Sequence, residues 1–414
     1  MVPTLAPMHD LMARLGDPHR AFSVVHVTGT KGKGSVCALV EAALHAAGIS
    51  VGRYASPHVH SMCERVSIRG HNVDESLLAE ALEQVLDARD EACRAGTPAK
   101  DTTWFDAMTA AAFVLFAQAG LAWAVVEVGL GGRLDSTNVA DGNVCVITNI
   151  ALEHTEVLGD SLAQIAREKA GIIKSGSFVV SGVPQGSEAY APILASAQEK
   201  HAILVTVDLQ IGVTRKNAAL AGAVLDHLGE CGLKDADGKL VARGLLTSKT
   251  VQSTRLPGRI EIIDAQVGVR PVTVVLDGAH VDIALRAVLE ELAEAPFADQ
   301  PMVVLFALGR DKNPQNMLGV LRERAELVIF VSLGNQNCWE PEELSAVAGE
   351  LGISSSIDKN IESALDISFG LIRERGWMLA TGSLHLIAPV REALGRNAFG
   401  KPVLETFLNH DDVG

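Results

Sequence analysis

A glycine-rich segment between an apolar run and a helix-like run is the feature that most constrains this chain. Phe22 to Val27 are mostly apolar, Val36 to Ala47 read as a helix, and between them stands Gly29-Thr30-Lys31-Gly32-Lys33-Gly34-Ser35. A buried strand, a glycine turn and a helix N-terminus form a cradle whose N–H groups and helix dipole face a phosphate. We therefore predict that these residues bind ATP, with a lysine at the terminal phosphates and a hydroxyl near Mg²⁺. Gly34 separates Lys33 from Ser35, unlike the strict P-loop pattern, and an ordinary glycine turn stays the alternative.

Length, charge and cysteine placement narrow the class of protein. A chain of 414 residues is too long for one typical core, so two domains are expected. The formal net charge of −15 argues against a nucleic-acid partner. The six cysteines are scattered without a Cys-x-x-Cys pair, which is typical of free thiols in a reducing cytoplasm rather than of disulfides or a zinc site.

One apolar stretch resembles a membrane span. Residues 107–126 are long and apolar enough to cross a bilayer. The stretch divides at Gly120, however, with helix-like residues 106–119 before it and strand-like residues 122–128 after it. A buried helix, turn and strand explain it better. The N-terminus also has no basic stretch followed by an apolar core, so we expect no signal peptide, no membrane partner and a cytoplasmic location.

The order of apolar segments predicts two α/β domains with mostly parallel sheets. Short continuous apolar runs alternate with helix-like segments, a pattern typical of parallel strands that are covered on both faces. The expected strands of the first domain are 24–27, 51–54, 122–128, 144–150 and 178–180. Those of the second are 272–276, 302–307, 327–331 and 377–380. We predict a P-loop ATP-binding domain at residues 1–256 and a smaller Rossmann-like domain at residues 257–414.

Chemistry-bearing residues follow several of these strands, at the edge where open α/β sheets bind ligands. Ser56 follows the second expected strand, in Ala55-Ser56-Pro57-His58, where a plain turn is an equally good interpretation. Glu127 lies at the end of the third strand, just before a glycine-rich turn. A carboxylate there is a hard oxygen ligand suited to Mg²⁺ beside a phosphate. The alternative is a glutamate that only stabilises the turn.

Two further candidates lie later in the chain. His154 follows the fourth expected strand and stands beside Glu153, which favours a ligand role over the structural role that is commoner for a lone histidine. Lys169 lies near the end of the expected helix 161–170. A lysine at that position usually serves as a surface charge that compensates the helix dipole.

Together these clusters resemble the Mur ligase superfamily and, within it, the folylpolyglutamate synthase/dihydrofolate synthase family. The resemblance runs from Val24 to about Arg391 and rests on the order of the motifs, since each motif alone is weak. Besides the glycine loop, the matching segments are Ser56-Pro57-His58, Glu127 to Asn138, Glu168-Lys169-Ala170-Gly171-Ile172, Leu256-Pro257-Gly258-Arg259, Asp277-Gly278-Ala279-His280, Asp311-Lys312 and Thr381-Gly382-Ser383.

The resemblance implies an enzyme that uses ATP to join L-glutamate to a folate-type carboxylate through an acyl phosphate. It implies that Lys33 and its loop hold the phosphates. It also implies that Ser56 and Glu127 bind one Mg²⁺ and His154 the second. Lys169 matches a lysine of the family that is carbamylated and thereby becomes a carboxylate-like metal ligand.

The resemblance also implies nucleotide contacts from both domains, with Asn217 in the first domain and Arg259 and Asp277 at the boundary and in the second. Asn217, Arg259 and Asp277 are expected to contact ATP in the cleft between the domains, and domain closure would assemble the site. His280 is predicted to help orient the incoming glutamate. Family precedent favours a monomer.

Departures from the family pattern fall where the acceptor is expected to bind. Leu5-Ala6-Pro7-Met8-His9 stands where the family has a glycine–leucine–acidic–arginine stretch that contacts the pterin. The other departures are Asp106 for glutamate, Glu153 for aspartate, Val281-Asp282 for asparagine–proline and Asn313 for aspartate. The acceptor, and the choice between one activity and two, therefore stay open. The alternatives are a Mur-type ligase with a non-folate acid acceptor and a non-catalytic P-loop nucleotide-binding protein.

Overall fold

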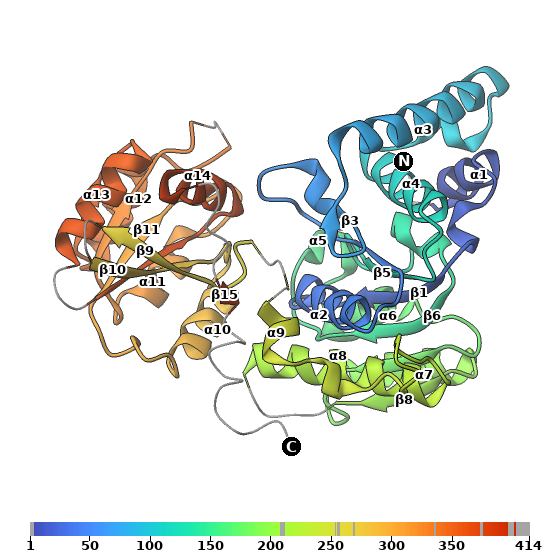
Figure 1. Ribbon diagram of the computed structural model, residues 1–414. Helices are drawn as coiled ribbons and strands as arrows, with labels where there is room; N and C mark the ends of the chain where they lie inside the picture. The colour runs from blue at the N-terminus through green and yellow to red at the C-terminus, as the bar shows by residue number, and fades with distance from the viewer. Residues whose placement is uncertain are drawn as a thin grey trace. The chain divides into compact units, whose positions relative to one another are not determined.

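A computed structural model describes residues 4–207, 212–252, 254, 257–267, 270–334, 337–372, 376–395 and 401–402. The chain divides into two compact units, Met1–Thr254 and Arg255–Gly414. Figure 1 shows that each unit consists of helices packed around its own sheet. Leu256, which was placed at the expected domain boundary, lies outside the described residues.

The first unit contains an eight-stranded sheet in the order β4-β3-β2-β5-β1-β6-β7-β8. Strands β2, β5, β1, β6, β7 and β8 pair in parallel, whereas β3 and β4 add an antiparallel edge. The strands are β1 Ser23–Thr28, β2 Val51–Tyr54, β3 Val66–Ile68, β4 His71–Asn72, β5 Trp123–Glu127, β6 Gly142–Ile147, β7 Phe178–Ser181 and β8 Ile203–Thr206. Because β1 lies between β5 and β6, the loops that follow these three strands meet at one edge.

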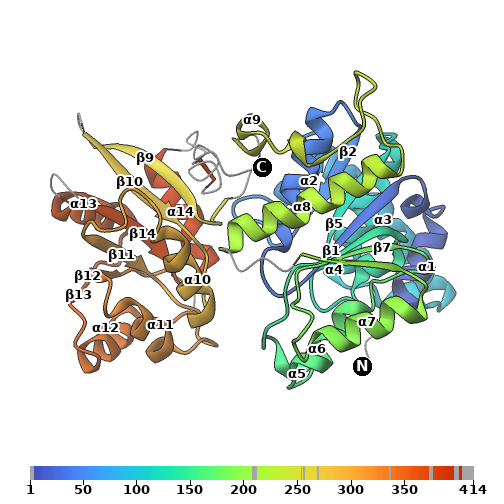
Figure 2. The same ribbon diagram turned by 90° about the horizontal axis from the view of Figure 1, so that it is seen from below.

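Helices cover both faces of this sheet, as Figure 2 shows. Helices α1, α3, α4, α6 and α7 pack their apolar side chains on one face, and α2 and α8 lie together on the other. The helices are α1 Ala6–Arg14, α2 Lys33–Ala46, α3 Glu75–Ala95, α4 Trp104–Gln118, α5 Thr155–Leu158, α6 Leu162–Ala170, α7 Tyr190–Glu199, α8 Val213–Glu230 and α9 Ser248–Gln252. Short 3₁₀ helices cover Pro18–Arg20, Met62–Arg65, Pro98–Asp101, Ser136–Val139 and Arg243–Leu245.

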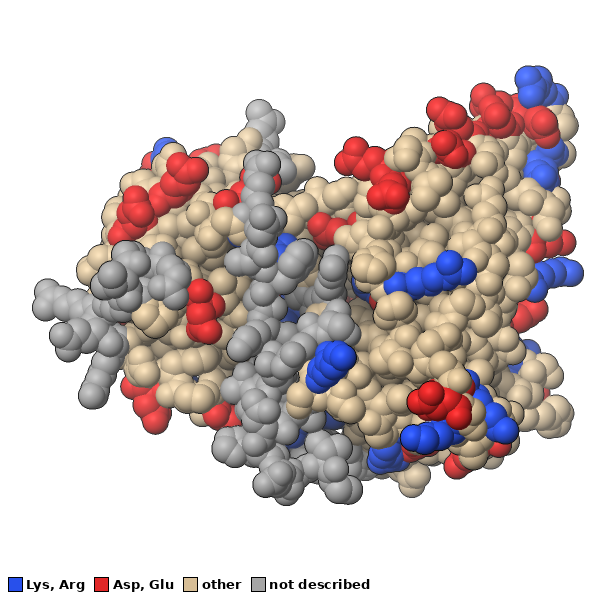
Figure 3. Space-filling model, in the orientation of Figure 1, with Lys and Arg blue, Asp and Glu red and all other residues tan. Residues whose placement is uncertain are grey.

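Helix α3 shows how sequence pattern decides burial. Its buried side chains recur every three or four positions, at Leu78, Ala81, Val85, Ala88 and Ala92. This spacing places them on one face of a helix, so most of the remaining positions face solvent. Figure 3 shows acidic side chains gathered over the exposed part of this helix.

The apolar stretch that resembles a membrane span is a buried helix followed by a strand, as expected. Thr103 caps the start of α4 by accepting the N–H of Asp106, and the Asp106 carboxylate accepts the N–H of Thr103 in return. The chain turns at Gly120, which has φ +61°, and enters β5. Among the described helices, none is long and apolar enough to cross a membrane.

The second unit contains a seven-stranded sheet in the order β13-β12-β11-β14-β10-β9-β15. Strands β10 to β14 pair in parallel, and β9 and β15 are antiparallel at one edge. The strands are β9 Glu261–Val267, β10 Arg270–Leu276, β11 Met302–Phe306, β12 Ala325–Phe330, β13 Ser355–Ile357, β14 Trp377–Thr381 and β15 Lys401–Pro402. The helices are α10 Asp282–Leu292, α11 Pro314–Leu321, α12 Pro341–Glu350, α13 Ile361–Leu371 and α14 Leu384–Leu394.

The structure confirms the predicted α/β class and the predicted buried parallel strands, but the sequence interpretation missed β3, β4, β8, β9, β13 and β15. The longest of these is β9. Asp264 and Gln266 alternate with Ile263, Ala265 and Val267 along this strand. An antiparallel strand near a sheet edge has one face outside the core, so it lacks the continuous apolar run that marks a buried parallel strand.

Candidate active site

The glycine loop joins the end of β1 to the start of α2. Gly29 has φ +146°, and a Cβ atom there would lie 1.8 Å from Thr148 Oγ1. Gly32 directly precedes α2 with φ +84°, and a Cβ atom there would lie 2.4 Å from Asn217 Oδ1. The backbone conformation and the lack of room both require glycine at these positions. A tight turn thus stands at a helix N-terminus, which is the arrangement that favours bound phosphate.

Asn217 reaches the glycine loop from a distant part of the chain. It belongs to α8, and only 5% of its surface is exposed. Resemblance alone had pointed to this residue, because an isolated asparagine in a helix carries no pattern of its own. The close approach to Gly32 places its amide beside the predicted phosphate cradle.

Two lysines share one acceptor in this loop. The Nζ atoms of Lys33 and Lys169 lie 3.2 Å and 2.9 Å from the carbonyl oxygen of Gly29, to which both donate. Lys33 begins α2, whereas Lys169 comes from α6, where only 5% of its surface is exposed. Lys169 is therefore not a surface charge at a helix end. Burial, followed by the nearby charge of Lys33, lowers the pKa of Lys169 to about 7.

Glu127 lies on the other side of the same loop. It is the last residue of β5, with 4% of its surface exposed, and its carboxylate accepts the N–H of Ser56 at 3.0 Å. A Cβ atom on Gly34 would lie 3.4 Å from Glu127 Oε2. Ser56, Glu127 and the first turn of α2 are thus neighbours, because β2, β5 and β1 are adjacent parallel strands.

His154 and Glu153 occupy the loop after β6. His154 has φ +53° and directly precedes α5, with 47% of its side chain exposed and Nδ1 4.0 Å from Glu156 Oε1. Glu153 instead pairs with Lys31 of the glycine loop, with 2.7 Å between Nζ and Oε1. Burial would raise the pKa of Glu153, but the charge and hydrogen bond of Lys31 hold it below its ordinary value.

The donor set fits a hard cation beside phosphate. In the part of the chain that the structure describes, no three His, Cys, Asp or Glu side chains gather closely enough to hold a metal ion. Of the predicted ligands, only Glu127 and His154 belong to these residue types, and Ser56 adds a hydroxyl. The oxygen donors of Glu127 and Ser56 suit Mg²⁺ with phosphate and water completing its coordination, whereas His154 would supply a nitrogen. The amine of Lys169 would join them only after conversion to a carboxylate-like group.

The predicted residues of the second unit lie in loops beside β10. Asp277 follows this strand, with 5% of its surface exposed, and accepts the N–H groups of Ile260 and Ala279, each at 2.8 Å. His280 Nδ1 lies 3.0 Å from the Gly278 carbonyl oxygen, and Arg259 is exposed. The motif segments around residues 258, 278 and 382 meet through backbone hydrogen bonds, whereas Leu256 of the first motif lies outside the described residues.

Two large side chains, Arg65 and Trp104, lie near Ser56. The guanidinium of Arg65 lies 4.8 Å from the centre of the Trp104 ring, and Arg65 Nε donates to His58 Nδ1 at 2.8 Å. Arg65 is buried, which lowers its pKa, whereas 53% of Trp104 is exposed. An exposed aromatic ring of that size at a helix start is a candidate for binding a flat ligand.

The residues at which the family pattern changes have structural partners. Asp106 accepts the hydroxyl groups of Thr103 and Ser136, so its carboxylate is committed to capping α4 and to the turn after β5. Met8 lies in α1 and is buried in the core of the first unit. The altered N-terminal stretch therefore contributes to the core.

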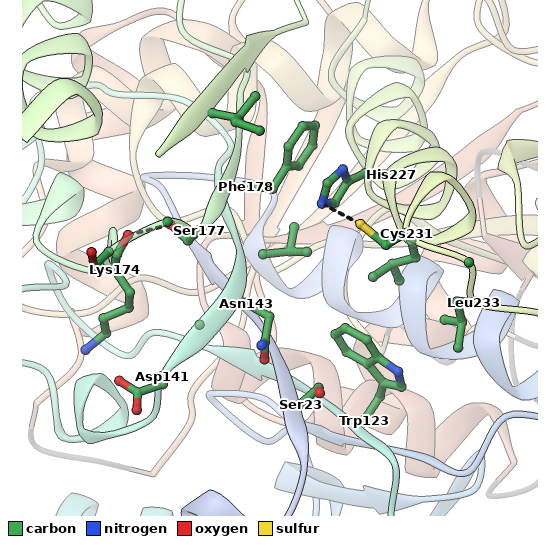
Figure 4. Close-up of a pocket in the computed structure, with 17 residues that line it drawn as sticks. Ser23, Trp123, Asp141, Asn143, Lys174, Ser177, Phe178, His227, Cys231 and Leu233 are labelled. Atoms are coloured by element: carbon green, nitrogen blue, oxygen red, sulfur yellow. Dashed lines mark hydrogen bonds between the residues drawn. The ribbon is translucent and has the colours of Figure 1, made fainter. Parts of the chain in front are cut away.

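A separate hollow lies at the opposite edge of the first sheet. Figure 4 shows its walls, which include Ser23, Trp123 and Phe178 at the starts of β1, β5 and β7, together with Lys174 and His227. Its volume is about 1050 Å³. The glycine loop follows the end of β1, so this hollow is distinct from the predicted nucleotide site.

Comparisons with known proteins agree with this arrangement. The Mur ligase middle domain matches residues 27–219, and the glutamate ligase domain of Mur ligases matches residues 258–384. The dihydrofolate synthase/folylpolyglutamate synthase of Escherichia coli is 32% identical over 94% of this chain and 91% of its own length. A probable bifunctional folylpolyglutamate synthase/dihydropteroate synthase of Haloferax volcanii is 31% identical over 92% of this chain, which spans only 47% of that longer protein.

Solved structures extend the likeness to three dimensions. The Mycobacterium tuberculosis folylpolyglutamate synthase complexed with ADP has a TM-score of 0.82 at 27% identity, with 96% of each chain covered. The bifunctional folylpolyglutamate synthase/dihydrofolate synthase with Mn, AMPPNP and L-glutamate bound has a TM-score of 0.79 at 29% identity, with 95% of each chain covered.

The fold and the site define a Mur-type ligase, in which a P-loop unit is followed by a glutamate ligase unit. Within that class, the chain belongs to the folylpolyglutamate synthase/dihydrofolate synthase family. It is thus an ATP-dependent ligase of this type, which uses ATP and a divalent metal ion and acts on small-molecule substrates.

Proposed function

We propose that this enzyme adds L-glutamate to a folate-type carboxylate, as a folylpolyglutamate synthase, a dihydrofolate synthase or both. The observation that carries the proposal is the phosphate cradle itself, with Lys33 and Lys169 on the carbonyl of Gly29 and the carboxylate of Glu127 beside Gly34. The glutamate ligase domain match in the second unit supports the choice of amino acid.

The reaction proceeds in two chemical steps. A carboxylate oxygen of the acceptor attacks the γ-phosphorus of ATP, giving an acyl phosphate and ADP. The α-amine of glutamate then attacks the acyl carbon, the amine loses a proton and phosphate leaves. Lys33 and the glycine loop hold the phosphates and neutralise the charge that spreads over them during transfer. Arg259 and Asp277 are expected to bind ATP from the second unit, and His280 to orient the glutamate amine.

The expected divalent ions are held by residues already described. Ser56 and Glu127 would hold one Mg²⁺, and His154 with carbamylated Lys169 the second; the bound ions would supply positive charge to the phosphates. A free amine reacts with CO₂ by forming an N–C bond and releasing a proton. The pKa of about 7 leaves much of Lys169 neutral at physiological pH, which supports carbamate formation there. A monomeric state and a cytoplasmic location stay predictions.

Parallel assays test the acceptor. Phosphate release from MgATP and L-glutamate is measured with dihydropteroate or with monoglutamyl tetrahydrofolate, and mass spectrometry follows the added glutamyl unit. A glutamylated product from either acceptor supports the proposal and names the activity. No product from a protein that binds ATP would point to a ligase with a different carboxylic acid acceptor, and ATP binding without any turnover to a non-catalytic nucleotide-binding protein.

The glycine loop gives one prediction. Gly29→Ala should weaken ADP binding about tenfold or more, because the new Cβ would displace Thr148 or the loop at a position with positive φ. The dissociation constant is measured by titration calorimetry alongside the melting temperature. Gly244→Ala, where a Cβ meets nothing within 4 Å, is the matched control. Equal ADP affinity in the two variants would contradict a phosphate-binding role for this loop.

A second prediction concerns the acceptor. We infer that the exposed ring of Trp104, backed by Arg65, is a platform for a flat aromatic acceptor. Trp104→Ala should raise the acceptor KM about fivefold to tenfold and leave the ATP KM unchanged, because one aromatic stack contributes roughly 1 kcal/mol. Leu77→Ala, an exposed apolar position of α3, is the control. An unchanged acceptor KM would remove Trp104 from the acceptor site.

A further inference from the structure

The segment from Thr148 to Thr155, called here the His154 segment, is bonded to the glycine loop at several points. Asn149 accepts the N–H of Thr30 on its carbonyl at 3.0 Å and that of Lys31 on its side chain at 2.9 Å. Thr148 Oγ1 donates to the Lys31 carbonyl at 2.6 Å. The N–H of Ala151 donates to Thr30 Oγ1 at 3.0 Å. The first half of the segment is therefore fixed to the loop through both backbone and side-chain groups.

Glu153 extends this connection to the second half of the segment. Its carboxylate accepts from Lys31 Nζ at 2.7 Å, with 19% of the Glu153 side chain and 33% of the Lys31 side chain exposed. Lys31 thus contacts the His154 segment through its backbone N–H, its carbonyl and its ammonium. Lys33, the other lysine of the glycine loop, instead donates to the carbonyl groups of Gly29 and Thr30.

The residues on both sides of His154 are held by hydrogen bonds. Its φ of +53° is uncommon for a residue with a side chain. On its C-terminal side, its carbonyl accepts the N–H groups of Val157 and Leu158 in the first turn of α5. On its N-terminal side, Glu153 is held by Lys31. Releasing Glu153 would leave His154 held through Ala151, three residues before it, and through a short helix after it.

We propose that Lys31 and Glu153 form a positioning pair, which fixes His154 relative to the glycine loop so that the nucleotide and the divalent ion bind cooperatively. Lys31 then serves to hold the loop after β6, and Lys33 serves the phosphates. The inference rests on the proposed function for the ligand role of His154.

The length of Glu153 matters to this pair. Aspartate is one methylene shorter, which would withdraw the carboxylate by roughly 1.5 Å from Lys31. An ion pair with this much exposure contributes little to overall stability. Its effect should therefore appear in the coupling between ligands and in local backbone protection rather than in the melting temperature.

The test uses ADP with and without Mn²⁺, because neither glutamate nor an acceptor is then needed. In wild type, the affinity for ADP should be higher with Mn²⁺ present than with EDTA present. Glu153→Gln and Lys31→Met should each reduce that increase about fivefold, and the double variant should reduce it no further. Glu153→Asp should reduce the Mn²⁺-dependent increase in ADP affinity to the same extent as Glu153→Gln. Asp160→Asn removes the same charge at an exposed position just beyond α5 and is the matched control.

Hydrogen exchange gives a second readout without any ligand. Amides of residues 150–158 should exchange faster in Glu153→Gln than in wild type or in Asp160→Asn, with the rest of the first unit unchanged. The proposal is overturned if the Glu153 and Lys31 effects add independently, if they match the control, or if exchange is unaltered. A wild type that shows the coupling but forms no glutamylated product would overturn the proposed function and leave the pair standing.

Discussion

Lys33→Ala is expected to lower kcat for glutamate ligation about a thousandfold. The variant loses the cation that the glycine loop places at the start of α2, where negative charge spreads over the phosphates during transfer. ADP affinity should fall much less, because the backbone of the loop stays in place. The fold should persist, since the Lys33 ammonium donates to loop carbonyls rather than to the core.

The measurement is phosphate release under saturating MgATP, combined with circular dichroism and a thermal melt. Lys200→Ala, which removes an exposed lysine after α7, controls for the loss of one positive charge. Turnover within tenfold of wild type would remove Lys33 from the phosphoryl transfer step. Loss of the thermal transition would instead show that Lys33 maintains the fold.

Lys169→Ala is expected to abolish turnover, and short carboxylic acids such as acetate should restore part of it. The alanine leaves space where the carbamate would stand, and a small carboxylate can supply the missing oxygen ligands. In wild type, activity should decline as the pH falls below about 7, because protonation of the amine blocks its reaction with CO₂. Removal of CO₂ should lower activity and added bicarbonate should recover it.

Carbon-13 NMR with labelled bicarbonate reports the carbamate independently of turnover. A carbamate signal should be present in wild type, lost in Lys169→Ala and retained in Lys174→Ala. Lys174 is a good control because burial lowers its pKa as well and its ammonium, like that of Lys169, donates to a backbone carbonyl, here that of Asn138. A signal that survives in Lys169→Ala, or full activity of that variant, would exclude the carbamate.

Local sequence pattern predicted those parts of this enzyme whose structure is determined by one short segment of the chain. The glycine loop between β1 and α2 is such a case, since Gly29 and Gly32 occupy backbone conformations that other residues avoid. The buried parallel strands are another, because burial on both faces leaves a continuous apolar run. Glu127 was recognised for the same reason, as a polar residue at the end of such a run.

Positions decided by distant neighbours were beyond local pattern. The motif around Lys169 was recognised from family resemblance, but its burial depends on how α6 packs against the loop after β1. The helix-end interpretation of this lysine as a surface charge was wrong for that reason. Lys31 was expected at the phosphates, and only the fold shows its ammonium on Glu153, more than a hundred residues away in the sequence.

Burial of the Lys169 amine also has a thermodynamic consequence for the folded state. The pKa of this group is about 7 in the native protein against 10.5 in its ordinary environment. Between these two values the unfolded chain binds more protons, so the free energy of unfolding should rise with pH across this window. At neutral pH the native protein is therefore less stable than it would be if the Lys169 amine beside the glycine loop kept its ordinary pKa. An apolar residue of similar length in place of Lys169 would make the folded state more stable, but it could not form a carbamate.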